Sequence, residues 1–218
     1  MDVTEQLADV SARVVAAARE AGRSPADVKL IAVSKTFPLS AVQQAHAAGH
    51  VHFGESRGQE LRDKARELAD VHWHFIGRIQ TNKAKYIAPV AYRIHALESA
   101  HQAAALSARA PHQLKCLLAV NVGREAQKSG VLPEQTLSLA EQLALTGDVD
   151  VVGLMCIPPR GVNSDPFYAE LADLAARGRA KGLALDELSM GMSSDYEAAV
   201  RHGATWVRVG SAIFGVRT

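Results

Sequence analysis

The sequence has almost no net charge, because 24 Lys and Arg residues are matched by 23 Asp and Glu residues in a chain of 218. The basic excess that marks a nucleic-acid-binding protein is therefore absent. No apolar run approaches the length of about 18 residues that a membrane span needs. The first six residues are acidic and polar, where an export signal would be basic and then apolar. We therefore expect a cytoplasmic protein that binds neither nucleic acid nor membrane.

Cysteine is also scarce. Only Cys116 and Cys156 occur, and each lies within an apolar, strand-like run. Two thiols in such surroundings are typical of buried free cysteines rather than of a disulfide framework. The length suits one domain that can bury a sizeable core. We expect a single domain over residues 1–218.

Short apolar runs alternate with helical stretches along the whole chain, and several runs are β-branched and nearly continuous, as strands buried on both faces should be. Eight βα units are most simply closed as a single (β/α)8 TIM barrel, and a doubly wound open sheet is the alternative. The predicted strands are Leu30–Ser34, His50–Phe53, Trp73–Ile76, Arg93–Ala96, Leu114–Asn121, Val151–Met155, Glu187–Met190 and Thr205–Val209. The predicted helices are an extra leading helix over 4–21, then Leu39–Ala48, Gly58–Ala69, Ser99–Arg109, Pro133–Leu145 and Asp165–Lys181.

Polar residues follow seven of the eight predicted strands. In a barrel of parallel strands the carboxyl ends all meet at one rim, where the βα loops carry function. Lys35 directly follows the first strand. An amine beside an apolar mouth is partly desolvated, which favours the neutral form that a Schiff base needs. A solvated loop lysine is the alternative, because most lysines lie on the surface.

Glycine and serine are concentrated after the last two strands, in Met190–Asp195 and Val209–Gly215. Backbone N–H groups at such turns bind anions, and in these barrels the same two loops often build a phosphate site. Ordinary helix capping by Ser193 and Ser211 is the alternative. A reactive lysine and a phosphate site in one mouth indicate pyridoxal 5′-phosphate (PLP), an aldehyde cofactor that carries a phosphate.

Arg208 lies between two valines in the eighth predicted strand, so alternation can place it in the barrel interior. A buried arginine needs an acceptor. The pyridine nitrogen of the cofactor is one candidate, and a guanidinium there would keep that nitrogen unprotonated and weaken the ring as an electron sink. A structural salt bridge with Asp186 or Glu187 is the alternative.

Six segments of the chain together resemble a known family. They are Leu30–Lys35, Phe53–Glu60, His74–Lys83, Gly153–Met155, Leu188–Asp195 and Thr205–Gly215. In sequence and order they resemble the pyridoxal phosphate homeostasis proteins, the proline-synthase-co-transcribed family or YggS group, over almost the whole chain. The resemblance implies a barrel similar to the N-terminal domain of alanine racemase, without that enzyme's C-terminal β domain.

The same resemblance implies that Lys35 carries PLP as an internal aldimine, that Arg208 faces the pyridine nitrogen and that the two serine-rich loops hold the phosphate. Ser56 stands where the family usually has asparagine, so a contact with the ring there would need a bridging water. The predicted cofactor-binding residues are Lys35, Ser56, His74, Met190, Ser193, Ser194, Arg208, Gly210 and Ser211. No residue is predicted to be catalytic.

Racemisation needs a second acid/base group, which alanine racemase takes from a tyrosine of its C-terminal domain. Only residues 213–218 follow the last barrel loop here, and no tyrosine lies at a predicted strand end. We therefore expect a carrier for PLP and vitamin B6 homeostasis that delivers the cofactor to apo-enzymes, as a monomer or weak dimer. A PLP-dependent enzyme with weak racemase-type activity is the alternative.

Two other patterns are interpreted as structural. His50/His52 and His72/His74 are spaced as metal ligands could be, but they lack a carboxylate or thiolate partner, so we expect hydrogen bonding and no metal. Lys83 and Lys85 are typical of a solvated helix start rather than of an RNA-binding patch. Lys128 follows the fifth strand, either near the mouth or in solvent.

Overall fold

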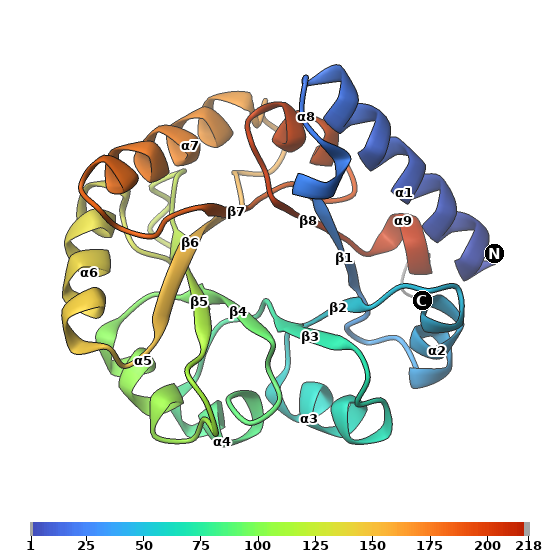
Figure 1. Ribbon diagram of the computed structural model, residues 1–218, viewed down its shortest axis with the longest axis horizontal. Coiled ribbons are helices and arrows are strands. Elements are labelled where there is room, and N and C mark those ends of the chain that lie inside the picture. The colour runs from blue at the N-terminus through green and yellow to red at the C-terminus, as the bar shows by residue number, and fades with distance from the viewer. Residues whose placement is uncertain (1, 216–218) are drawn as a thin grey trace.

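The computed structural model describes residues 2–215 as a closed barrel of parallel strands surrounded by helices (Figure 1). The strands follow chain order around the barrel, and the eighth pairs with the first. The predicted TIM barrel is confirmed, and the open-sheet alternative is wrong. Met1 and residues 216–218, which belong to the predicted domain 1–218, lie outside the described residues.

All eight predicted strands are present, with bounds that differ by up to two residues. The strands are β1 (Lys29–Val33), β2 (His52–Glu55), β3 (His72–Phe75), β4 (Arg93–Leu97), β5 (Lys115–Val120), β6 (Asp150–Cys156), β7 (Glu187–Ser189) and β8 (Trp206–Val209). The α-helices are α1 (Val3–Glu20), α2 (Leu39–Ala47), α3 (Gly58–Glu67), α4 (Ala84–Ile87), α5 (Ala100–Ser107), α6 (Pro133–Thr146), α7 (Asp165–Ala180), α8 (Tyr196–Arg201) and α9 (Ser211–Phe214). Two 3-10 helices are η1 (Pro25–Asp27) and η2 (Thr81–Lys83).

The leading helix α1 covers the seam where the last strands meet the first. Its N-cap Asp2 accepts a hydrogen bond from the backbone of Thr4 at 2.9 Å. Leu7 and Val10 are buried on the face that packs against α8, α9 and α2 (Figure 1). The extra helix predicted over 4–21 is thereby confirmed. None of the helices within residues 2–215 is both long and apolar enough to cross a membrane.

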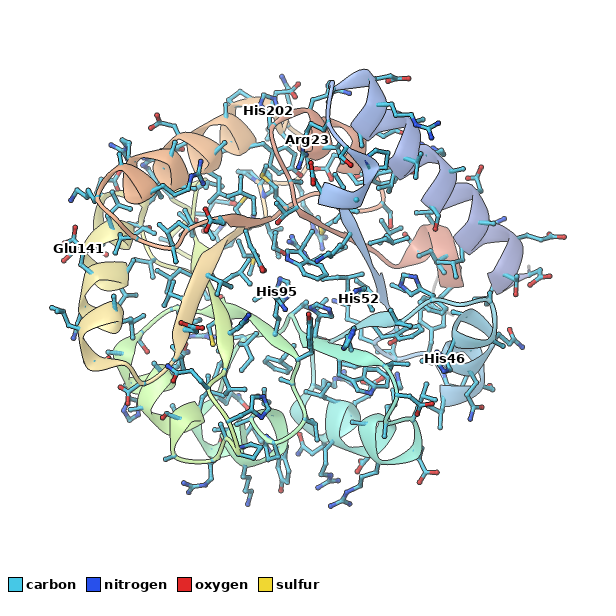
Figure 2. The ribbon with its side chains drawn as sticks, in the orientation of Figure 1. Arg23, His46, His52, His95, Glu141 and His202 are labelled. Carbon is cyan, nitrogen blue, oxygen red and sulfur yellow. The ribbon has the colours of Figure 1, made fainter. Side chains whose placement is uncertain are left out.

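Most of the apolar core lies in one large cluster that packs the strands against the surrounding helices. Cys116 and Cys156 are buried free thiols, as predicted. Inside the barrel a second, small cluster contains Ile31, Val33 and Trp206. Several polar side chains also lie in the interior, which departs from the branched aliphatic layers usual in such barrels. These interior polar residues are His52, His74, Arg93, His95, Glu187, Ser189 and Arg208, of which His52 and His95 are labelled near the centre of Figure 2.

Gly153 allows β6 and β7 to approach closely. A Cβ atom at this position would overlap the carbonyl oxygen of Glu187 and lie 2.6 Å from its carbonyl carbon. Because both atoms belong to the backbone, no side-chain rotation can relieve the overlap.

We predict that Gly153→Ala destabilises the barrel by about 3 kcal/mol, because the added methyl group forces two paired strands apart. The measurement is the free energy of unfolding in urea. Gly58→Ala is the control, because the added methyl there would meet no backbone atom and would lie 3.2 Å from the side chain of Ile87 and 3.5 Å from that of Tyr86. Equal unfolding midpoints for the two variants would contradict this account.

Candidate functional site

Lys35 lies at the carboxyl-end rim of the barrel, two residues beyond β1, and is half-buried. β1 pairs directly with β8. Gly210, the residue after β8, packs closely against the end of β1, since a Cβ atom on it would lie 3.2 Å from the carbonyl oxygen of Val33. The backbone turns sharply after Lys35, since Thr36 adopts a φ of 70°. That left-handed conformation costs a β-branched residue about 1–2 kcal/mol. Surrounding contacts must therefore hold the turn.

The loops after β7 and β8 lie side by side at this rim. The backbone N–H of Gly210 donates to Ser193 Oγ at 3.4 Å, which joins the two loops. The N–H groups of Ser193, Ser194, Ser211 and Ala212 have no acceptor within residues 2–215. Unpaired backbone donors on two adjoining loops are suited to binding a phosphate.

The serine side chains of these two loops do not cap the helices that follow them. Asp195 precedes α8 and Gly210 precedes α9, and neither helix has a side-chain cap bond from Ser193 or Ser211. The capping alternative is therefore wrong. Gly191 has a φ of 89°, and a Cβ on it would lie 2.6 Å from a side-chain atom of α8, so only glycine fits where the first loop begins.

A tyrosine orders the loop after β7. Tyr168, on α7, donates its hydroxyl to Asp195 Oδ2 at 2.8 Å, while Asp195 Oδ1 accepts from the backbone of Met192 at 2.8 Å. Tyr168 lies within a helix and at no strand end, as predicted, but the tertiary structure brings its hydroxyl to the loop after β7. Burial, together with the Asp195 carboxylate, raises the pKa of Tyr168. Its hydroxyl thus holds the loop and is a poor proton donor at neutral pH.

Arg208 is buried inside the barrel, and no carboxylate of residues 2–215 forms an ion pair with it. Its Nη1 donates to Ser189 Oγ at 2.6 Å and its Nη2 to the carbonyl oxygen of Cys156 at 2.9 Å. The alternative of a salt bridge to position 186 or 187 is wrong, because Glu187 pairs with Arg93 at 2.6 Å. Burial lowers the pKa of Arg208. A buried cation held only by neutral acceptors can take a further acceptor from a ligand.

Three histidines form a hydrogen-bonded chain that ends at Arg208. His52 Nδ1 lies 3.0 Å from His74 Nε2, His74 Nδ1 lies 2.9 Å from His95 Nε2, and His95 Nδ1 lies 2.8 Å from Ser189 Oγ. Because Ser189 Oγ already accepts from Arg208, its hydroxyl can donate to His95, and each ring then donates through Nε2 to the next. Burial lowers the pKa of all three rings, to about 3 for His52, so the chain is neutral.

The other predicted residues, Ser56, His74 and Met190, lie in three different surroundings. Ser56 immediately follows β2, and its backbone packs so closely on Gly77 that a Cβ there would overlap the Ser56 carbonyl oxygen. His74 lies in the histidine chain, two side chains away from Arg208. Met190 is fully buried in the large hydrophobic cluster. Contact of the nine predicted residues with a cofactor stays a prediction.

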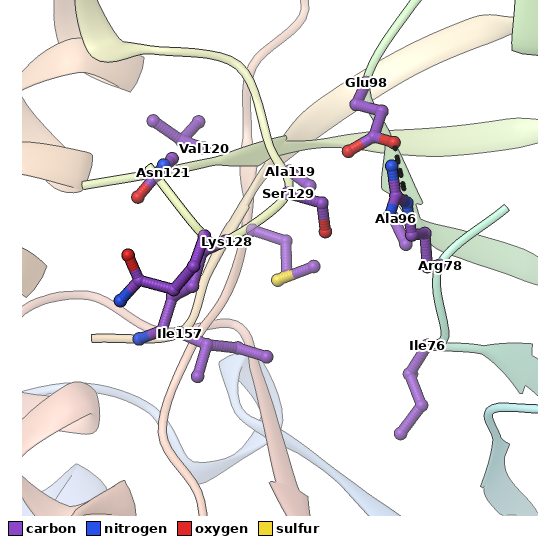
Figure 3. Close-up of a pocket in the computed structure, with 12 residues that line it drawn as sticks. Ile76, Arg78, Ala96, Glu98, Ala119, Val120, Asn121, Lys128, Ser129 and Ile157 are labelled. Carbon is purple, nitrogen blue, oxygen red and sulfur yellow. Dashed lines mark ion pairs between the residues drawn. The ribbon is translucent and has the colours of Figure 1, made fainter. Parts of the chain in front are cut away.

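A cavity of about 340 Å³ opens at the carboxyl ends of β3 to β6 (Figure 3). Ile76, which also packs against the interior cluster, forms part of its wall. Arg78 Nε lies 3.6 Å from Glu98 Oε1 at its edge, and Lys128 Nζ donates to the carbonyl oxygen of Pro158 at 3.2 Å. Lys128 is therefore a cavity residue. Within residues 2–215 no cluster of three or more His, Cys, Asp or Glu side chains could hold a metal ion.

Fold and mouth together define a parallel (β/α)8 barrel with a lysine and anion-binding loops at one end. Residues 7–218 match the family model for the alanine racemase N-terminal domain. Over 220 residues the chain is 46% identical to the pyridoxal phosphate homeostasis protein of Pseudomonas aeruginosa, covering 99% of this chain and 96% of the relative. The identity to the protein of the same name from Aquifex aeolicus is 39%, covering 100% of this chain and 99% of that one.

Solved structures agree with these relatives. PipY from Synechococcus elongatus is similar with a TM-score of 0.84 with PLP bound and 0.85 without, at 36% and 37% identity, and 98% of this chain covers 100% of PipY. Alanine racemase from Corynebacterium glutamicum shares the fold alone, at 18% identity and a TM-score of 0.72 over 61% of that enzyme. The chain belongs to the pyridoxal phosphate homeostasis protein family, and the resemblance found in its sequence is confirmed.

The neutral histidine chain predicts acid sensitivity. In the folded protein the pKa values of His74 and His95 lie well below 6.5, so the unfolded chain binds more protons as the pH falls below that value. The contribution of these two histidines to the free energy of unfolding is therefore fully present above pH 6.5. Below that pH it falls by about 1.4 kcal/mol per pH unit for each buried histidine.

The measurement is the free energy of unfolding between about pH 5 and 7.5, where carboxylates contribute little. His95→Gln should reduce the slope of the unfolding free energy against pH by the contribution of one histidine, whatever the variant's stability at neutral pH. Identical slopes in the variant and the unaltered protein would show that His95 is not held neutral by the fold.

Proposed function

We propose that this chain binds PLP at the barrel mouth, holds it covalently through Lys35 and delivers it to apo-enzymes in PLP homeostasis. The proposal is carried by one observation: Lys35, the unpaired N–H groups of two loops and the Arg208 guanidinium come from three elements around one end of the barrel. A family relative at 46% identity and the PLP-bound PipY structure at 36% support it. A cytoplasmic location and a monomer or weak dimer stay predictions.

The residues fit the groups that PLP presents. Its phosphate carries up to about two negative charges, and the N–H groups of Ser193, Ser194, Ser211 and Ala212 are donors without acceptors. The guanidinium of Arg208 can donate to an unprotonated pyridine nitrogen but cannot protonate it. When bound, PLP would supply an aldehyde carbon. An unprotonated amine at Lys35 could form a C=N bond with that carbon, the oxygen leaving with two protons as water.

Two features favour a carrier over an enzyme. A ring nitrogen kept unprotonated by Arg208 is a weak electron sink, so carbanion chemistry is poorly supported. A second acid/base group is also hard to find, since Tyr168 donates to Asp195 and Tyr92 stacks on His72 at the opposite end of the barrel. We therefore propose that the chain stores and releases PLP without transforming it.

We predict that the purified protein with PLP gives a visible absorption band that borohydride bleaches, leaving the label on Lys35. Lys35→Ala should lose band and label while the barrel stays folded, because the side chain that is removed lies beyond the end of β1. Peptide mapping of the reduced adduct locates the label. Lys85→Ala, at an exposed position on α4, is the control and should behave as the unaltered protein does. Undiminished labelling of Lys35→Ala would sink the assignment.

The carrier proposal also predicts the outcome of incubating the PLP-loaded protein with L- or D-alanine. Chirality should change no faster than with free PLP, since neither Tyr168 nor Tyr92 is placed to act as the second acid/base group. An apo-enzyme that needs PLP should in contrast regain activity when mixed with the loaded protein. Repeated turnovers of alanine would establish the enzyme alternative instead.

A further inference from the structure

The two peptide groups on either side of Lys35 are both held by helix α3. Lys64 Nζ donates to the carbonyl oxygen of Ser34 at 2.9 Å, and the backbone N–H of Thr36 donates to Glu60 Oε1 at 2.6 Å. Lys64 and Glu60, one turn apart on α3, also pair with each other at 2.9 Å. The residues that flank Lys35 are thus tied to one rigid element through charged side chains.

A buried carboxylate completes this cluster. Glu55, on β2, is fully buried, and its Oε1 accepts from Lys64 Nζ and from Ser34 Oγ, both at 2.7 Å. Lys64 thereby uses all three of its ammonium donors, on Ser34, Glu55 and Glu60. Its side chain is only 9% exposed, so this bonding fixes the ammonium in place.

The cluster holds the backbone of Thr36 in a strained conformation. Thr36 is β-branched and has a φ of 70°, a conformation that such residues rarely adopt. The Glu60 carboxylate accepts the Thr36 N–H in that conformation and forms the one hydrogen bond of this N–H within residues 2–215. Without Glu60 the Thr36 backbone can relax, and the peptide group that it shares with Lys35 then changes direction.

We infer that Glu60 and Lys64 are positioning residues for Lys35, with Glu55 holding Lys64, and that they fix the direction in which the Lys35 amine meets the aldehyde of PLP. The inference rests on the proposed function. Orientation of a nucleophile contributes directly to the rate of bond formation. Loosening these contacts therefore slows covalent attachment of PLP far more than it weakens the barrel.

Glu60→Gln tests this role with little change in side-chain size. The rate at which PLP becomes borohydride-trapped on Lys35 should fall about tenfold, because the hydrogen bonds that Glu60 accepts from Thr36 and Lys64 lose their charge assistance and weaken. Hydrogen exchange of the Thr36 amide should become faster in the protein without PLP, which is a readout independent of the cofactor. Glu67→Gln, an exposed position on the same helix, is the matched control and should change neither quantity.

Thr36→Gly separates positioning from general stability. Glycine adopts a positive φ without strain, so the bond from Glu60 matters less in that background, and Glu60→Gln should then slow labelling by less than about threefold. A tenfold loss that persists in the Thr36→Gly background overturns the inference. So does a Glu60→Gln variant that has a lower unfolding midpoint but is labelled at the original rate, because that is a structural role alone.

Failure of the two proposals can be told apart. If the unaltered protein is not labelled on Lys35, the proposed function fails, and the positioning role fails with it. If the unaltered protein and Glu60→Gln are labelled at equal rates on Lys35, only the positioning role is overturned.

Discussion

A guanidinium buried in a barrel without a carboxylate beside it constrains the groups around it. Arg208 keeps its charge at neutral pH and must be solvated by neutral acceptors, which are Ser189 and the carbonyl oxygen of Cys156. The histidines behind Ser189 must also stay neutral, because a proton on His95 would add a second charge next to the first. The side chains that surround Arg208 inside the barrel are therefore polar, hydrogen-bonded and neutral.

The amino end of the barrel is closed by a different arrangement. Arg93 pairs with Glu187 at 2.6 Å, and Trp206 donates its indole N–H to the same carboxylate at 2.7 Å. One arginine inside the barrel is thus neutralised and the other, nearer the mouth, is not. This difference leaves Arg208 able to interact with a ligand. Under the proposed function, Arg208 would keep the ring nitrogen of PLP unprotonated, and retention of PLP and poor carbanion chemistry would then have one common cause.

The sequence predicted the parts of this structure that leave a local pattern. Buried parallel strands are recognisable as β-branched runs, and a lysine or a glycine–serine segment directly after such a run marks the rim. The histidine chain left no such signal, because His74 and His95 are 21 residues apart and meet only through the register of adjacent strands. The Arg93/His95 alternation could have indicated polar side chains on one face of β4.

The contacts between strands and helices were equally hidden in the sequence. Glu55 was expected in the loop after the second strand, yet it belongs to β2 and is buried, because Lys64 reaches it from α3. The sequence around Lys64 is that of an ordinary helix, and nothing in it indicates that the lysine is buried. Tyr168 lies 27 residues before its partner Asp195, so only the tertiary structure brings α7 to the loop after β7. Each of these pairs compensates a buried polar group by a residue distant in sequence.

We propose that Lys35, the N–H groups of two loops and Arg208 together hold one molecule of PLP, and a crystal structure of the protein grown with PLP is the decisive measurement. We expect continuous density from Lys35 Nζ to the cofactor, the phosphate on the N–H groups of Ser193, Ser194, Ser211 and Ala212, and the ring nitrogen at Arg208. Density for PLP away from Lys35, or a phosphate held elsewhere on the rim, would show that these three groups do not form the binding site.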